Sequence, residues 1–343
     1  MSEYLFTYTG ATMEAVSALV NQQSDIAINW SGGLHHAHKS EASGFCYIND
    51  IVLAILELLK VHLRVLYIDI DVHHGDGVEE AFNSSDRVMT ISLHRYGLVK
   101  EAQPPHLFFP GTGAVNDNGN TSSIGNHFAL NVPIPAGIHD DDYTLLFRSV
   151  VGRALETFRP GAIVLQCGAD SLGGDRLGQF NLNIKAHGEC LAFVKRYGVP
   201  LLILGGGGYT ARNVARAWCH ETALAVGAEL SDELPMHILP RPQAFQGRTH
   251  GDSRLYPELK DYHVDDCKRK DLDSIVERCY EELRYVKSAP SVVMERLPSR
   301  AVMERIRRQI DEEYEADKAV ESTKGEAGRR RRERNAGGRG EFR

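Results

Sequence analysis

The segment Asp69–Gly77, which reads DIDVHHGDG, carries the strongest indication of how this 343-residue chain folds. It overlaps the aliphatic and β-branched run Arg64–Asp71, which is typical of a buried strand, and it gathers carboxylates and imidazoles where that strand ends. Side chains two positions apart on a strand point the same way, so Asp71 and His73 can bind one ion. Buried carboxylates need a cation or a full set of hydrogen-bond donors. A lone Asp-x-His is more often a pair of hydrogen-bonded core residues, so other segments must support the metal site.

A second polar segment lies upstream, where residues 31–50 read SGGLHHAHKSEASGFCYIND. It contains the adjacent histidines His35 and His36 beside glycines. Histidine titrates near neutral pH, and two neighbours with different acidic partners can be held in opposite protonation states. Asp69 and Asp76 are available as those partners, so the pattern favours acid/base chemistry.

Two further apolar runs end on polar residues. Residues 162–171, AIVLQCGADS, finish at Asp170, and residues 201–204 lead into Gly205–Gly208 and Tyr209. Ligands of open α/β sheets bind outside the carboxyl ends of the strands, so we expect these groups to form one site. The glycines permit positive φ and close backbone approach. No Lys-Ser or Lys-Thr follows them, which excludes a phosphate-binding P-loop.

Length and composition agree with one large α/β domain. With 42% hydrophobic residues the chain can bury a sizeable core. Long apolar strands that alternate with amphipathic segments predict a mostly parallel sheet with helices on both faces. We expect helices at residues 50–62, 186–196 and 211–225, the first so apolar that it must be well covered. No membrane-length apolar run is present, and six cysteines without metal-ligand spacing favour a reducing, intracellular setting.

These segments resemble the class I zinc-dependent histone deacetylases, which have the arginase/deacetylase fold. The resemblance covers about residues 5–299. It implies three zinc ligands, a catalytic histidine pair with two acidic partners, and a tyrosine that completes the site. These are, respectively, Asp71, His73 and Asp170; His35 and His36 with Asp69 and Asp76; and Tyr209.

The residue types suit amide hydrolysis. Two carboxylates and a neutral imidazole leave a zinc ion nearly neutral with an open position, as expected of a catalytic site. One histidine removes a proton from the attacking water and later protonates the departing amine, and we assign this role mainly to His36. His35 would stabilise developing charge, and Tyr209 would donate to the tetrahedral oxyanion.

The resemblance also implies an acetyl-lysine tunnel, a potassium site and a basic patch that binds inositol phosphate. Their residues are Gly44, Phe45, Phe109 and Leu177 for the tunnel; Asp69, Ser92 and Leu93 for potassium; and Arg176 and Arg212 for inositol phosphate. Phenylalanine faces stabilise a buried aliphatic stem by about 25 cal/mol per Å². Each of these sites has a simpler alternative. The tunnel phenylalanines can be ordinary core residues, the serine and aspartate of the potassium site can bond to each other, and the two arginines can be solvated surface residues.

We predict a catalytic domain over residues 1–299 and a charged, disordered tail over residues 300–343. Residues 324–343 hold eight Lys or Arg against three Glu, so the net charge of −7 leaves −12 on residues 1–323. An acidic body favours attraction of basic histone tails. The arginine-rich run 329–334 can act as a nuclear localisation signal or a weak nucleic-acid contact. The resemblance implies corepressor partners and residence in the nucleus, with the cytoplasm as a second location.

Three features depart from the family pattern. The family's first strand and its neighbouring loops have no counterpart, so we expect an N-terminally truncated sheet with an exposed edge. Residues 98–107 interrupt a link at the tunnel rim that is short in the family, and residues 236–251 replace an aromatic-rich segment. We interpret these features as products of splicing or of the gene model.

Three functions are therefore open. The first is zinc-dependent removal of acetyl groups from histone lysines in chromatin-based transcriptional repression. The second is deacetylation of acetylpolyamines or similar small amides, which share the fold and the metal chemistry. The class I sequence of residues 40–50 and the acidic net charge of residues 1–323 favour protein substrates over small amides. The third is a catalytically weak splice form that acts as a corepressor scaffold, which the departures favour.

Overall fold

Six strands build the central sheet of the computed structural model. They are β1 (Ile26–Asn29), β2 (Val65–Asp69), β3 (Val88–Arg95), β6 (Ala129–Ile134), β7 (Ala162–Gln166) and β8 (Leu201–Leu204). Their order across the sheet is β1-β8-β7-β2-β3-β6, and every neighbouring pair is parallel. The predicted parallel α/β sheet is confirmed. All strands consequently present their carboxyl ends at one edge, where the polar residues identified in the sequence follow.

The structure describes residues 1–286 apart from 101, 120–121, 238, 240–252 and 260–261. The chain divides into two units, Met1–Ser291 and Val292–Arg343. The second unit lies outside the described residues, as do the predicted tail from residue 300 onward and most of residues 236–251. No helix in the described part of the chain is both long enough and apolar enough to span a membrane.

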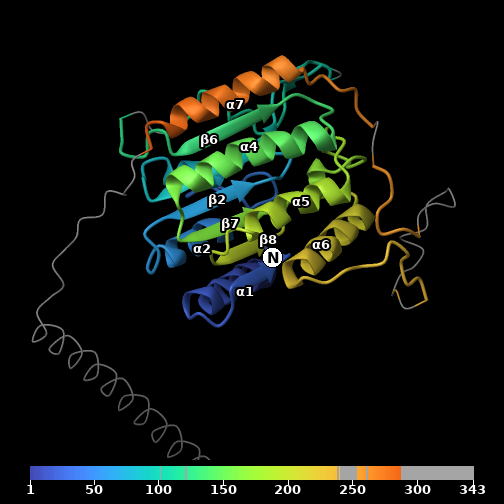
Figure 1. Cartoon of the computed structure of the whole chain (residues 1–343), viewed down its shortest axis with the longest axis horizontal. Coiled ribbons are helices and arrows are strands. Elements are labelled where there is room, and N and C mark those ends of the chain that lie inside the picture. The colour runs from blue at the N-terminus through green and yellow to red at the C-terminus, as the bar shows by residue number, and fades with distance from the viewer. Residues whose placement is uncertain (101, 120–121, 238, 240–252, 260–261, 287–343) are drawn as a thin grey trace, which may run out of the picture. The chain divides into compact units, whose positions relative to one another are not determined.

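Helices cover both faces of the sheet. They are α1 (Ser2–Val20), α2 (Asp50–Leu58), α3 (Asp76–Phe82), α4 (Asp140–Phe158), α5 (Ile184–Lys195), α6 (Ala211–Val226) and α7 (Arg269–Leu283), together with the 3-10 turn η1 (Ala169–Ser171). Alternate residues of β2 belong to two separate apolar clusters. Leu66 and Ile68 pack with α4, α5 and α7, whereas Val65 and Tyr67 pack with α1, α2 and α3. Figure 1 shows α4 and α5 crossing in front of the strands.

The first predicted helix is shorter than expected. It ends at Leu58 instead of residue 62. The Arg87 side chain donates through Nη2 to the carbonyl oxygens of Leu59 and His62, at 2.7 and 2.9 Å. These carbonyls therefore bond to a distant guanidinium instead of continuing the helix. The other two predicted helices are confirmed as α5 and α6, with ends shifted by at most two residues.

The expectation that this helix is well covered is wrong for two of its residues. Leu53 and Leu56 are 38% and 50% exposed, while Ile51 and Ile55 are fully buried. The buried residues share one helical face that packs against α1 and the sheet. Apolar content alone thus predicted more burial than one contacting face provides.

Two short strands within residues 98–107 form a hairpin. The strands β4 (Leu98–Val99) and β5 (His106–Leu107) pair antiparallel, with Leu98 opposite Leu107. The amide of Phe108 donates to the carbonyl of Gly97 at 2.9 Å and closes the base of the hairpin. Arg95 donates through Nη2 to the Leu98 carbonyl at 3.0 Å. The segment that departs from the family pattern is therefore attached to the carboxyl end of β3.

Candidate metal and catalytic site

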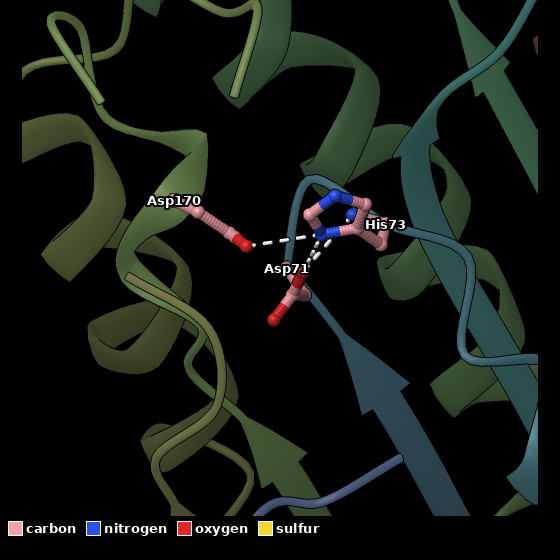
Figure 2. Close-up of side chains that lie close together, drawn as sticks. All are labelled: Asp71, His73 and Asp170. Atoms are coloured by element: carbon pink, nitrogen blue, oxygen red, sulfur yellow. Dashed lines mark hydrogen bonds and ion pairs between the residues drawn. The ribbon is translucent and has the colours of Figure 1, made fainter. Parts of the chain in front are cut away.

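The ends of β2 and β7 bring three ligand-type side chains together. Asp71 and His73 follow β2, and Asp170 lies in η1 just after β7. One ligand atom from each lies within 4.8 Å of the other two, and all three residues are buried. Figure 2 shows Nδ1 of His73 facing both carboxylates. The three residues predicted as metal ligands therefore converge on one point.

Asp71 is held by several donors. Its Oδ1 accepts a hydrogen bond from the His73 amide at 3.0 Å. Its Oδ2 accepts from Nε2 of Gln166 at 3.0 Å and from the Gly207 amide at 2.9 Å. Burial raises the pKa of Asp71, but the positive charges of His35 and His73 outweigh it and hold that pKa well below its usual range. Asp71 is thus an ionised carboxylate in a fixed orientation.

Asp170 has fewer donors. Its Oδ1 accepts from the Val72 amide at 2.9 Å. Its Oδ2 is buried, lies 3.0 Å from Nδ1 of His73 and makes no hydrogen bond with any described residue. Burial and the neighbouring Asp71 raise the pKa of Asp170 to about 7. Burial lowers the pKa of His73, but Asp170 and Asp71 raise it to about 10. Two buried acids and one imidazole with an unsatisfied oxygen fit a divalent cation.

Two glycines let the backbone approach the carboxylates. A Cβ atom at Gly168 would lie 2.1 Å from Oδ2 of Asp71, and one at Gly207 would lie 2.1 Å from Oδ2 of Asp170. Any larger residue at these positions would displace a ligand-type side chain. Gly207 belongs to the glycine run that the sequence singled out, and its role here is close approach.

His35 and His36 lie beside the triad with separate acidic partners. Nδ1 of His35 is 2.7 Å from Oδ2 of Asp69, and Nδ1 of His36 is 2.7 Å from Oδ1 of Asp76. Their Nε2 atoms are 3.0 Å apart, and both imidazoles are buried. The pairing of each histidine with a different carboxylate matches the arrangement that the resemblance implied.

The two histidines have opposite charge preferences. Burial disfavours the imidazolium of His35, but the carboxylates of Asp69 and Asp71 raise its pKa to about 9. Burial and the charge of His35 lower the pKa of His36 to about 4. At neutral pH one imidazole is therefore a cation and its neighbour is a neutral base. Such a divergent pair is typical of acid/base sites.

A cavity of about 430 Å³ reaches this centre from the surface. Its lining includes four predicted residues, Gly44, Phe45, Phe109 and Leu177, together with His36, His73 and Tyr209. The Phe109 ring lies edge-on to His36, with centroids 4.9 Å apart. Phe45 and Leu177 are 76% and 46% exposed at the mouth. The predicted tunnel residues therefore surround one cavity that ends at the histidines.

Tyr209 is half-buried in the wall of this cavity. The carboxylate of Asp175 accepts hydrogen bonds from the amides of Tyr209 and Thr210, at 2.7 and 3.2 Å. Burial and the charge of Asp71 raise the pKa of the Tyr209 phenol, which therefore keeps its proton. Asp175 was not identified from the sequence, although it directly precedes Arg176, which was predicted to be functional. Other lining residues that the sequence did not identify are Val99, His106, Phe108 and Gln179.

The residues predicted for potassium lie next to the histidine pair. Asp69 and Ser92 are opposite each other on β2 and β3, and Leu93 follows Ser92. Asp69 accepts from Tyr67 Oη at 2.5 Å and from the Asp71 amide at 3.0 Å, so both of its oxygens have donors. The potassium site stays a prediction.

The two predicted inositol-phosphate arginines are exposed. Arg176 lines the mouth of the cavity, and Arg212 lies in the first turn of α6. Thr210, which precedes α6, donates to the carbonyl of Gly174 at 2.9 Å and links the two segments. Their role in anion binding stays a prediction.

The chain is similar to known proteins over most of its length. The histone deacetylase domain family matches residues 1–225. The chain is 50% identical over 318 residues to histone deacetylase 1 of Oryza sativa subsp. japonica, which covers 92% of this chain and 58% of that protein. It is 60% identical over 231 residues to histone deacetylase 19 of Arabidopsis thaliana, covering 67% and 44%. Histone deacetylase 1 of Homo sapiens is 48% identical over 313 residues, covering 88% and 58%. The chain thus spans about half the length of these relatives.

Proposed function

Because this chain belongs to the histone deacetylase family, we propose that it is a metal-dependent amide hydrolase that removes acetyl groups from N-acetyl-lysines of histone tails. The observation that carries this proposal is the pair of adjacent histidines, one cationic and one neutral, beside the triad at the inner end of the 430 Å³ cavity. An amide needs both a base for water and an acid for the leaving amine. Adjacent imidazoles in different protonation states suit that requirement.

We propose zinc as the metal, held by Asp71, His73 and Asp170. Two carboxylates and one imidazole are a donor set that leaves a fourth position open. When bound, zinc would polarise the amide carbonyl and lower the pKa of the attacking water. The same proposal includes potassium at Asp69 and Ser92, where the cation would bind beside the partner of His35.

His36 is the proton carrier in this proposal. Its Nδ1 is bonded to Asp76, so its basic atom is Nε2. With its pKa lowered by burial and by His35, this imidazole is neutral, and its Nε2, which lies 3.0 Å from Nε2 of His35, would exchange that contact for the attacking water and accept the proton of the water. The same nitrogen then protonates the departing lysine amine. His35 keeps its positive charge next to the developing negative charge.

Tyr209 and the cavity walls would position the substrate. The phenol keeps its proton and can donate to the oxyanion within the cavity that His36 also lines. The aliphatic stem of the acetyl-lysine would pack between Phe45 and Phe109, whose faces exclude water from the reacting amide. His106 and the positive Arg176 also line this cavity.

We also propose a place in chromatin-based repression in the nucleus, in complex with corepressor proteins, as the family resemblance implies. We include in this proposal an inositol phosphate at Arg176 and Arg212, since both arginines are exposed on linked segments. The acidic net charge of residues 1–323 favours basic histone tails over acidic partners.

The test is zinc content and hydrolysis of an acetyl-lysine histone peptide by the purified chain, with and without a hydroxamate chelator. Bound zinc and chelator-sensitive turnover are expected. Acetylspermidine serves as the comparison substrate, because it represents the acetylpolyamine alternative. If the chain hydrolysed it faster than the histone peptide, the proposed histone substrate would be contradicted. Bound zinc without turnover of either would contradict the enzyme and favour a corepressor scaffold.

A further inference from the structure

A buried histidine and glutamate lie behind the metal triad, outside the cavity. His187 is on α5 and Glu221 on α6, and both are fully buried. Nδ1 of His187 is 2.6 Å from Oε1 of Glu221. Nε2 of His187 is 3.0 Å from the carbonyl oxygen of Gly168. The imidazole therefore joins two helices to the loop that carries Asp170.

The hydrogen bonds define the protons of this pair. A carbonyl oxygen can only accept, so Nε2 of His187 carries a proton and donates it to Gly168. A second proton lies between Nδ1 and the Glu221 carboxylate. Among the described residues, Glu221 makes no side-chain hydrogen bond except to His187, and its Oε2 has no partner. The side-chain hydrogen bond of the Glu221 carboxylate is thus made to His187, and it orients the imidazole.

Gly168 is linked to both acidic ligand-type residues, Asp71 and Asp170. It precedes Asp170 by two residues, and its Cα faces Oδ2 of Asp71 so closely that a Cβ would lie 2.1 Å from that oxygen. Its amide donates to Oε1 of Gln166 at 2.8 Å, and Nε2 of Gln166 donates to Oδ2 of Asp71 at 3.0 Å. A displacement of Gly168 would therefore move both carboxylates.

Other donors to this loop are weaker or lie to one side. Oγ of Ser171 also reaches the Gly168 carbonyl, at 3.3 Å, but it belongs to the same turn and cannot anchor it. Nε1 of Trp218 donates to the carbonyl of Cys167 at 2.9 Å and holds the preceding peptide. Among the described residues, two side chains donate to the Gly168 carbonyl. Ser171 belongs to the same turn, so His187 is the one that attaches this carbonyl to a different element, helix α5.

We propose that His187, oriented by Glu221, is a positioning residue that sets the geometry of the metal site through its hydrogen bond to the Gly168 carbonyl. This inference rests on the proposed function, because it concerns the metal held by Asp71, His73 and Asp170. Partners of this kind orient ligands that they do not replace, and their loss typically lowers metal affinity or activity by 10- to 100-fold.

Two conservative substitutions separate the two bonds of His187. In His187→Gln the amide nitrogen falls near the place of Nε2, so the bond to Gly168 is kept and the one to Glu221 is lost. In His187→Asn the amide nitrogen falls near the place of Nδ1, so the bond to Glu221 is kept and the one to Gly168 is lost. Each variant is the control for the other, since both remove the ring.

The measurement is zinc affinity of the purified chain by competition with a chromophoric chelator, with thermal unfolding recorded for each protein. We expect His187→Asn to bind zinc about 10- to 100-fold more weakly than the wild type, and His187→Gln within about threefold of it. Cobalt absorption spectra should be altered in His187→Asn alone. Wild-type affinity and spectra in both variants, or equal losses in both, would overturn the proposal.

Loss of a buried partner can prevent folding, so the same pair is also made with Glu221→Gln, which leaves no unpaired buried charge. The expected order of zinc affinity is unchanged in that background, and a reversed or equal order would overturn the proposal. Failure of the proposed function is distinguishable, because it shows in the wild-type chain itself, which would then bind no zinc or bind zinc without hydrolysing the peptide, whereas failure of this inference shows only in the comparison of the two variants.

Discussion

Two buried aspartates differ in the number of donors that surround them. Asp50, at the start of α2, is fully buried, and its carboxylate accepts from Oγ1 of Thr12 at 2.7 Å and from the amides of Gly33 and Leu34 at 3.0 and 2.9 Å. Asp170 is equally buried, but its Oδ1 accepts one hydrogen bond, and its Oδ2 has the ion pair with Nδ1 of His73 at 3.0 Å and no hydrogen bond among the described residues. Burial raises the pKa of both.

This comparison separates a structural acid from a ligand-type acid. Burial and a raised pKa are common to both, so neither property identifies a metal site. The discriminating feature is the donor set, because a carboxylate that hydrogen bonds already satisfy has no need of a cation. The following predictions test whether this difference holds in solution.

The largest expected effect is that of Asp170→Asn. It removes a charged ligand, and the several kcal/mol of transition-state stabilisation that a metal supplies correspond to about 1000-fold or more in rate. Zinc content and acetyl-lysine peptide hydrolysis are measured together. The control is Asp266→Asn, a half-exposed carboxylate that pairs with Lys100. Full activity of Asp170→Asn would remove the distinction between the two aspartates.

Asp50→Ala should affect folding instead of metal binding. It leaves three donors without their acceptor, which we expect to lower the free energy of unfolding by about 3 kcal/mol. For a domain of this size that corresponds to roughly 10 °C in the melting temperature. Thermal unfolding and zinc affinity are recorded on the same sample. A loss of zinc affinity in the folded protein at an unchanged melting temperature would contradict the structural role.

Tyr209→Phe tests the donor in the cavity wall. Removal of one preformed oxyanion donor should lower kcat about 100-fold, whereas the zinc content should stay that of the wild type. The ring itself is kept, so its packing against Phe45 is retained. Steady-state kinetics on an acetyl-lysine peptide provide the measurement. An unchanged kcat would show that the phenol is not the donor.

Zinc affinity should rise with pH, because bound ligands must be deprotonated. The carboxylates raise the pKa of His73 to about 10, and burial and Asp71 raise that of Asp170 to about 7. Both groups therefore release protons on binding, and affinity should increase about tenfold or more from about pH 7 to about pH 8. Chelator competition at constant ionic strength measures it. A flat affinity over this interval would mean that the triad is already deprotonated.

The smallest expected effect is that of Thr12→Val. It removes one donor to Asp50 and should lower the free energy of unfolding by about 1 kcal/mol. Zinc affinity should be unchanged, since Thr12 lies on α1 and contacts no member of the triad. Denaturant unfolding with the wild type alongside provides the value. A destabilisation as large as that of Asp50→Ala would mean that Thr12 does more than donate to this carboxylate.

Sequence patterns predicted several parts of the site because those parts depend on local order. Apolar runs that end at Asp71 and Asp170 identified strands and the edge at which they meet, and a parallel sheet brings such ends together. The adjacent His35 and His36 were recognisable as a pair for the same local reason. The residues of the tunnel needed the family resemblance, since a single phenylalanine such as Phe109 has no distinguishing pattern.

Other features depend on segments that are far apart in the chain. The exposure of Leu53 and Leu56 follows from what packs on α2, which helical periodicity alone does not reveal. The hairpin at residues 98–107 pairs through backbone hydrogen bonds, and its sequence has no regular alternation. The buried pair of His187 and Glu221 joins two helices, and nothing in either helix identifies its partner.

The order of amino acids was thus sufficient to predict a parallel α/β sheet and, through the family resemblance, to nominate Asp71, His73 and Asp170 as ligands. Only the folded chain decided which oxygens have donors, since Val72 and Asp170 meet across 98 positions in the sequence. Hydrogen-bond satisfaction is a property of contacts between distant segments, and strand periodicity is a property of neighbours. For this reason the acids could be identified before folding was considered, while the difference between Asp50 and Asp170 could not.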